Sequence, residues 1–131
     1  MSRWTRCAAL TDAGGAPITR RITSQSRLFR EWDVVLCPVL PTPAILHDHG
    51  PMEARRVDVD GEAVPYQAQA MWSSVAAVGG LPATAMPIGL SPAGLPIGVQ
   101  IVGPYLEDRT TVHFAELAER EFGGFVPPPG W

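Results

Sequence analysis

Two histidines and one cysteine are the side chains of this sequence with the plainest capacity for chemistry. His47-Asp48-His49 sets two imidazoles two residues apart, and Asp58 and Asp60 follow. Zn²⁺ takes such ligands, but a loop pair without an evident third ligand is more typical of a solvated loop. Cys37 with one of the histidines as base is a second possibility, although a thiol in an apolar strand is usually inert packing. We therefore assign no metal ligand and no catalytic residue within this chain.

Serine chemistry is the third possibility, and the sequence offers little for it. Ser73-Ser74 is the only pair of adjacent serines, and no glycine flanks it. A serine hydroxyl is a weak nucleophile until a base removes its proton. All ten basic residues are Arg, so the 131 residues contain no Lys. A mechanism that needs a lysine base is therefore excluded for this chain alone.

Composition limits the remaining classes. A chain of 131 residues, 46% of them hydrophobic, fits one ordinary domain with a core. The net charge of −3 and the lack of a basic stripe argue against nucleic acid as a partner. No apolar run approaches the roughly 20 residues that span a bilayer, so no membrane partner is expected. The two cysteines lie outside any CxxC motif. We expect a cytoplasmic protein with reduced thiols and no cofactor.

The pattern of apolar and turn residues predicts the elements that must position these groups. Residues 1–18 are expected to be an irregular extension, and 38–64 a long connection. The helices are predicted over 19–32, 65–78 and 108–122, and the strands over 33–37, 83–88 and 97–102. Asp108 is the expected cap of the last helix. The expected inward residues of the second and third helices are Ala68, Met71, Trp72, Val75 and Val78, then Phe114, Leu117, Ala118 and Phe122.

These elements indicate an α/β fold in which the last two strands form an antiparallel hairpin. The strand over 97–102 is apolar on both faces, because Ile97, Val99 and Ile101 point one way and Val102 the other. Such a strand needs helices on both faces and strands at its edges. About three predicted helices provide little surface to cover both faces of a sheet that contains it. The sequence therefore indicates one piece of a larger sheet.

Four segments of the chain form an ordered set of motifs. They are D-V-V-L-C-P at 33–38, G-L-P-A-T-A-M-P-I-G at 80–89, G-L-P-I-G-V-Q-I-V-G at 94–103 and L-E-D-R-T-T at 106–111. In this order they resemble the amidase-signature hydrolases. The family patterns are D-V-L-L-x-P before a Pro/Thr stretch, then G-x-P-A-x-x-x-P-x-G, then G-L-P-x-G-x-Q-x-x-G, then the opening of a last helix. One such motif alone would be weak evidence, but the ordered set is specific.

The resemblance implies that 19–131 is the carboxy-terminal segment of an amidase domain, with a partial amidase-type fold. Complete members hydrolyse carboxamide C–N bonds with a nucleophilic Ser, a second Ser on a cis peptide bond and a Lys. The Gly- and Ser-rich segment that carries the two serines is absent here, as is any Lys. Ala77 also stands where members usually have Asn. The chain alone is therefore expected to be inactive.

The resemblance also places the Pro-rich stretch after the first strand near the substrate of the complete enzyme. We expect Leu40, Thr42 and Trp72 to line that pocket. The expected partners are an amino-terminal amidase segment or a second copy of the chain, with a small-molecule amide as the substrate of the complete enzyme. Trp72 as a core residue is the plainer interpretation, and Gln100 is expected to satisfy its buried amide on backbone.

Two other functional classes stay open at this point. A small non-catalytic binding or interaction module would reuse this part of the fold without hydrolysis. An independent hydrolase built on Cys37 and a histidine is weakened by the lack of any nucleophile-elbow motif.

Overall fold

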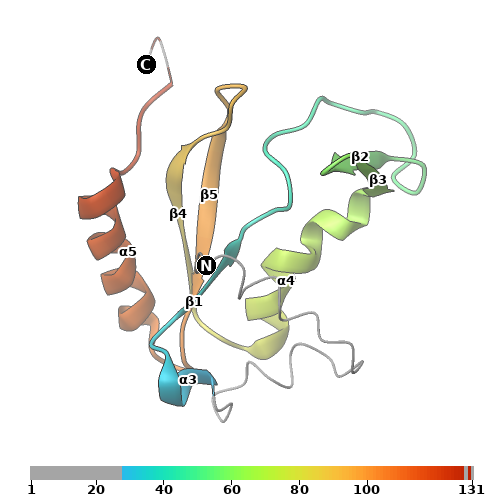
Figure 1. Cartoon of the computed structure of the whole chain (residues 1–131). Coiled ribbons are helices and arrows are strands. Elements are labelled where there is room, and N and C mark those ends of the chain that lie inside the picture. Colours follow the sequence, from blue (N-terminus) through green and yellow to red (C-terminus); the bar gives the residue numbers. More distant parts are fainter. Residues whose placement is uncertain (1–27, 129, 131) are drawn as a thin grey trace.

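A computed structural model describes residues 28–128 and 130, and its centre is a three-stranded antiparallel sheet (Figure 1). The strand order is β1 (Val35–Pro38), β5 (Pro96–Val102), β4 (Ala83–Leu90). A single helical turn, α3 (Leu28–Glu31), precedes β1. β5 is therefore the central strand. The three strands predicted from the sequence thus lie in one sheet.

The predicted hairpin of the last two strands is also confirmed. β4 and β5 pair from Ala83 opposite Val102 to Leu90 opposite Pro96, with a bulge between Pro87 and Gly89. Gly94 closes the connecting turn at a φ of 76°, a left-handed conformation that glycine adopts without steric cost. The Pro- and Gly-rich link thus joins two long antiparallel strands.

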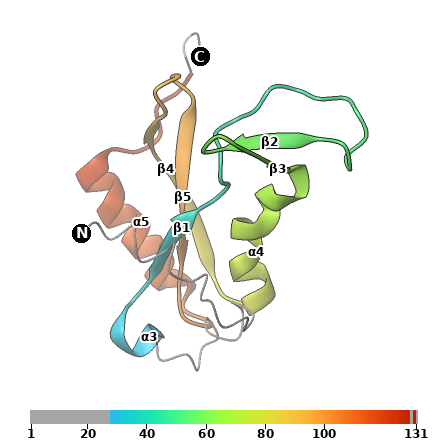
Figure 2. The same ribbon diagram turned by 45° about the vertical axis from the view of Figure 1, so that its right-hand side comes forward.

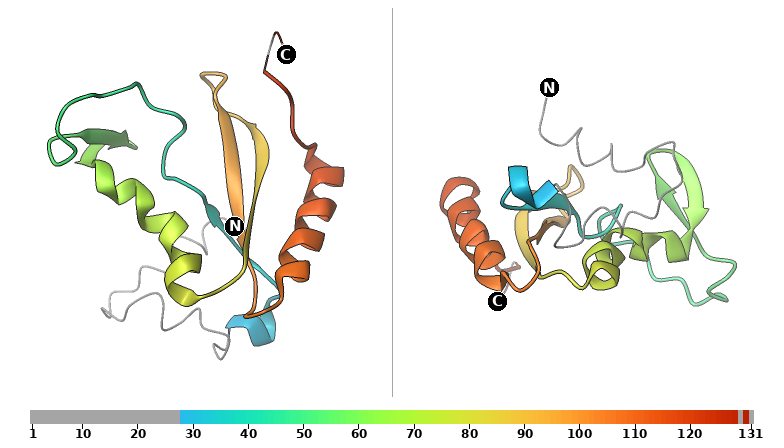
Figure 3. Two further views of the ribbon diagram at one scale, coloured as in Figure 1. Left: turned by 180° about the vertical axis from the view of Figure 1, so that it is seen from behind. Right: turned by 90° about the horizontal axis from the view of Figure 1, so that it is seen from below.

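Two helices cover opposite faces of this sheet, α4 (Ala70–Gly79) and α5 (Asp108–Phe122) (Figure 3). Side chains alternate along β5, so Val102 faces α4 while Val99 and Ile101 face α5. The core beneath α4 contains Val35, Cys37, Val75, Ala76, Leu81 and Val102. The core beneath α5 contains Met86, Val99 and Ile101, with Phe114, Ala115 and Ala118 packed on it. The α/β class and the two apolar faces of the last strand are confirmed.

The end of α4 follows the glycine signal in the sequence. Gly80 takes the left-handed conformation with a φ of 62°. Its N–H bonds to the Ala77 carbonyl at 3.3 Å, and the Leu81 N–H bonds to the Ala76 carbonyl at 3.0 Å. This pair of bonds is a Schellman motif, which satisfies the last carbonyls of a helix. Buried Leu81 then carries the chain into β4.

The expectation of a long connection over 38–64 was wrong. The segment contains β2 (Arg56–Val59) and most of β3 (Glu62–Pro65), which form a separate two-stranded hairpin. A 3₁₀ turn, η1 (Tyr66–Gln69), leads from β3 into α4, so the helix expected from residue 65 begins as a tighter turn. Figure 2 shows the hairpin at the amino-terminal end of α4, away from the three-stranded sheet. Asp60 and Gly61 supply the two positive φ angles of its turn.

The inward face of α4 is narrower than the sequence predicted. Val75 and Ala76 are buried and Trp72 packs beside them. Met71 and Val78, expected to point inward, are 49% and 66% exposed. Successive helix residues differ by about 100°, so these two, seven residues apart, lie together on one side of the buried stripe.

The predicted bounds of α5 are confirmed, but two details differ. Glu107 occupies the N-cap position without a side-chain capping bond, and Asp108 is the first helical residue. A carboxylate in the first turn still interacts well with the helix dipole. Leu117 and Phe122 are 48% and 72% exposed, because α5 meets the sheet along Thr111, Phe114, Ala115 and Ala118.

Some expectations concern residues that the structure does not describe. The irregular extension over 1–18 lies there entirely, and so does most of the helix expected over 19–32, of which α3 is the described part. Within the described part, no helix has the length and apolar character needed to cross a bilayer.

Candidate functional site

The stretch that follows β1 carries two of the three expected substrate-lining residues. Leu40 is an exposed large apolar side chain in this stretch. Thr42 is half-buried, and in the described part of the chain its buried Oγ1 has no hydrogen-bond partner. Nearly all buried polar atoms in proteins are paired, so an orphan hydroxyl calls for an explanation such as an absent partner.

Trp72, the third expected lining residue, connects α4 to the sheet. Its side chain is half-buried and packs on the core beneath α4. Its backbone carbonyl accepts a 3.1 Å hydrogen bond from Gln100 Nε2 of β5, and the same nitrogen lies 3.3 Å from Cys37 Sγ of β1. The expectation that Gln100 satisfies its amide on backbone is confirmed. Gln100 therefore fastens α4 to the two strands beneath it.

The cysteine has the geometry of a packed thiol. Cys37 is 1% exposed and lies in the core beneath α4. His47 and His49 are exposed in the loop after β1. A general base must lie within hydrogen-bond reach of the group whose proton it takes, and the nucleophile must reach the substrate. Burial of the thiol gives the Cys/His interpretation no support.

The paired serines are occupied by their own helix. Ser73 Oγ donates to the Ala70 carbonyl at 3.1 Å, and Ser74 Oγ donates to the Met71 carbonyl at 2.8 Å. Such bonds to the preceding turn are common for helical serines. Both hydroxyl protons are directed at helix carbonyls, so neither serine has the setting of a nucleophile.

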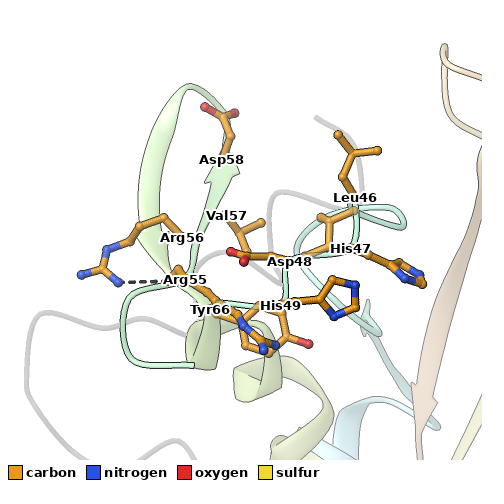
Figure 4. Close-up of a pocket in the computed structure, with 10 residues that line it drawn as sticks. Leu46, His47, Asp48, His49, Arg55, Arg56, Val57, Asp58 and Tyr66 are labelled. Carbon is orange, nitrogen blue, oxygen red and sulfur yellow. Dashed lines mark hydrogen bonds between the residues drawn. The ribbon is translucent and has the colours of Figure 1, made fainter. Parts of the chain in front are cut away.

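The hairpin β2–β3 and the loop before it line an open pocket of about 660 Å³ that was not expected from the sequence (Figure 4). Arg55 is held there by a 2.9 Å bond from its Nε to the Gly50 carbonyl, and its guanidinium carbon lies 5.7 Å from the centre of the Tyr66 ring. The wall mixes apolar, acidic and basic side chains. Its members are Ile45, Leu46, His47, Asp48, His49, Arg55, Arg56, Val57, Asp58 and Tyr66.

The pocket brings the two histidines together without making a metal centre. Their rings meet edge to face with centroids 6.2 Å apart. Asp48 between them accepts a 2.8 Å bond from the Gly50 N–H. Among residues 28–128 and 130, no three His, Cys, Asp or Glu side chains are grouped to hold a metal. None of Leu40, Thr42 and Trp72 lines this pocket.

The β2–β3 hairpin, which the sequence analysis did not predict, has a turn signal in the sequence. Asp60-Gly61 follows an alternating Val57-Asp58-Val59, and the Asp-Gly pair is a strong two-residue turn signal. Asp58 Oδ1 accepts a 3.1 Å bond from the Gly61 N–H and tightens the turn.

Comparison with known proteins relates this arrangement to one family. The family model described as Amidase matches residues 16–112. The chain belongs to the amidase family. A solved structure titled "Crystal structure of amidase" superposes on 72% of the chain with a TM-score of 0.61 and 27% identity. The three-stranded sheet with its two helices is therefore a segment of the amidase fold.

Two curated relatives show how the sequence is shared. A glutamyl-tRNA(Gln) amidotransferase subunit of Mesorhizobium japonicum is 31% identical over 100 residues, which is 76% of this chain and 18% of the relative. Fatty-acid amide hydrolase 2-A of Danio rerio is 51% identical over 49 residues, 37% of this chain and 9% of that protein. The chain covers 21% of the solved amidase. It thus spans about a fifth or less of these proteins.

Proposed function

We propose that this chain is the carboxy-terminal part of an amidase that hydrolyses carboxamide C–N bonds. In the complete enzyme it completes the fold and forms one wall of the substrate pocket. The main support for this proposal is the match of the family model to residues 16–112, together with the superposition on a solved amidase. The reaction itself belongs to a nucleophilic Ser, a Ser on a cis peptide bond and a Lys, as the family resemblance implies.

The chemistry explains why the chain alone should be inert. Amide hydrolysis needs an activated nucleophile, a proton for the leaving amine and donors for the oxyanion. The 131 residues contain no Lys to move protons between the serines and the leaving group. Ser73 and Ser74 donate to carbonyls of their own helix. None of the three requirements is met by the described side chains.

Thr42 is the best supported of the proposed lining residues. Its buried Oγ1 lacks a partner in the described part of the chain, and a substrate amide or a neighbouring segment of the complete domain would supply one. Leu40 is an exposed apolar side chain two residues earlier and would contact the apolar part of a substrate. Trp72 is the weakest of the three for this role, because its ring already packs on the core.

Activity measurements test the proposal. The purified chain should show no turnover of aliphatic or aryl amides, and Cys37→Ala should change nothing. Turnover that persists through purification and is lost in Cys37→Ala would contradict the proposal and favour a Cys/His hydrolase.

The lining residues are tested in a complete enzyme that carries this chain as its carboxy-terminal part. Leu40→Ala, Thr42→Val and Trp72→Phe should alter the ratio of kcat/KM between a small aliphatic and a bulky aryl amide more than they alter the melting temperature. Equal losses of stability at all three positions, with an unchanged ratio, would mark them as core residues instead.

A further inference from the structure

The surface of α4 that faces away from the sheet carries no charge. None of the ten residues of α4 is Asp, Glu, Lys or Arg. Met71 and Val78 are 49% and 66% exposed along one edge of it, and Ala70 and Ala77 are exposed beside them. A helix that lacks a charged, solvated face is unusual at a protein surface. We call the exposed residues Ala70, Met71, Ser73, Ala77 and Val78 the outer face of α4.

The polar atoms on the outer face do not make it a solvated surface. Ser73 Oγ and the neighbouring Ser74 Oγ both donate to carbonyls of the preceding turn. Alanine and serine are small, so another element can approach this part of the helix closely. Met71 and Val78 lie together at one edge of the small residues, and their flexible or branched apolar side chains gain free energy on burial. The outer face thus has the composition of a packed interface.

The size of the outer face bears on what covers it. A ten-residue helix is about 15 Å long, so one face of it offers far less than the roughly 800 Å² per partner of a stable interface. A symmetric pair of chains joined only here would be weak. The matched amidases are much longer, and this chain covers only 21% of the solved one. A large polypeptide of that kind can cover the outer face together with other surfaces.

We infer that the outer face of α4 is the surface on which the amino-terminal part of an amidase domain packs. This inference rests on the proposed function and adds to it the place of contact. α4 lies wholly within the region matched by the family model, residues 16–112, whereas most of α5 lies beyond it. Met71 and Val78 become buried in the assembled domain, and α5 stays at its surface.

Charged substitutions on the two helices provide a matched test. The 131-residue chain is co-expressed with the part of the solved amidase that precedes the matching segment, on separate tags. Met71→Glu/Val78→Glu places two carboxylates on the outer face of α4. Leu117→Glu/Phe122→Glu places two on α5 at nearly equal exposure, 48% and 72%. Burying an unpaired charge is costly, so the α4 pair should weaken co-purification by about tenfold or more and the α5 pair should not.

A third variant, together with circular dichroism, separates loss of binding from loss of folding. Ala77→Arg adds bulk and charge on the outer face and keeps a good helix former. All these variants should retain the circular dichroism spectrum of the parent chain, because the altered side chains are exposed. Unchanged binding by both α4 variants, or loss of binding in the α5 variant, would overturn the inference alone.

Two further outcomes concern the parent chain. Failure of the parent chain to bind would overturn the proposed function together with the inference. A dimer of the chain that only the α4 variants dissociate would assign the outer face to a second copy, and this result would overturn the inference while leaving the proposed function in place.

Discussion

α4 and α5 cover opposite faces of one sheet, yet only α5 has the outer surface of a finished domain. Six of the fifteen α5 residues are charged, namely Asp108, Arg109, Glu116, Glu119, Arg120 and Glu121, while α4 has none in ten. A charged outer face opposite an apolar inner stripe is the pattern of a helix at a protein surface. The difference supports the inference that α4, and not α5, packs against the remainder of an amidase domain.

Beneath the helices the two sides are built alike. Each holds one buried polar residue that ties the helix to a strand. Gln100 donates to the Trp72 carbonyl under α4, and Thr111 Oγ1 lies 2.8 Å from Thr84 Oγ1 under α5. Each also has its own apolar core. The inner packing is thus similar on both sides. The two helices differ in their outer faces, which are charged on α5 and uncharged on α4.

The largest effect is expected in the α5 core. Ile101 is 0% exposed on the central strand, so Ile101→Ala should lower the free energy of unfolding by about 2–5 kcal/mol. Ile97→Ala removes the same atoms from a half-buried position of the same strand and should cost less. Urea denaturation of the complete chain measures both. Equal small losses, below about 1 kcal/mol, would show that the α5 side is not a packed core.

The two buried polar residues allow a more local comparison. Gln100→Leu and Thr111→Val each remove a buried hydrogen-bonding group and should each cost about 1–3 kcal/mol. Amide hydrogen exchange should quicken in residues 70–79 for Gln100→Leu and in residues 108–122 for Thr111→Val. Equal acceleration of both helices by either substitution would mean that the two sides of the sheet unfold as one unit and not separately.

The smallest effect, with the opposite sign, is expected at Thr42. Its buried Oγ1 makes no hydrogen bond in the described part of the chain, so Thr42→Val removes an unsatisfied group. The melting temperature of the isolated chain should stay the same or rise, because an unpaired buried hydroxyl costs about 1–3 kcal/mol. Thr110→Val is the control, since Thr110 Oγ1 donates to Glu107 Oε2 at 3.0 Å. A clear fall in stability for Thr42→Val would reveal a partner for that hydroxyl.

The sequence predicted the fold best where local signals and periodicity agree. The hairpin over β4 and β5, the end of α4 at Gly79-Gly80 and the bounds of α5 follow from turn residues and apolar patterns. The buried side of each helix was predicted less well. Met71 and Leu117 are apolar residues at helical spacing, but contact with a sheet selects a stripe narrower than the set of apolar positions.

The candidate site was harder to predict than the fold. The Asp60-Gly61 turn was a usable signal that the prediction of a long connection overlooked. The pocket beside it depends on how the hairpin and the loop at 45–49 fold against each other, and no residue pattern encodes that. The lining role of Leu40, Thr42 and Trp72 depends on the remainder of an amidase domain. It therefore stays a prediction.

Hydroxyl-radical footprinting can show whether α4 packs on the rest of the domain, because it measures the solvent exposure of individual side chains. The chain is oxidised alone and in the presence of the amino-terminal part of an amidase. Met71 and Leu117 begin at nearly equal exposure, 49% and 48%. We expect the partner to protect Met71 severalfold and to leave the oxidation of Leu117 unchanged. Equal protection of both residues, or protection of Leu117 alone, would contradict the claim that α4 faces the rest of the domain.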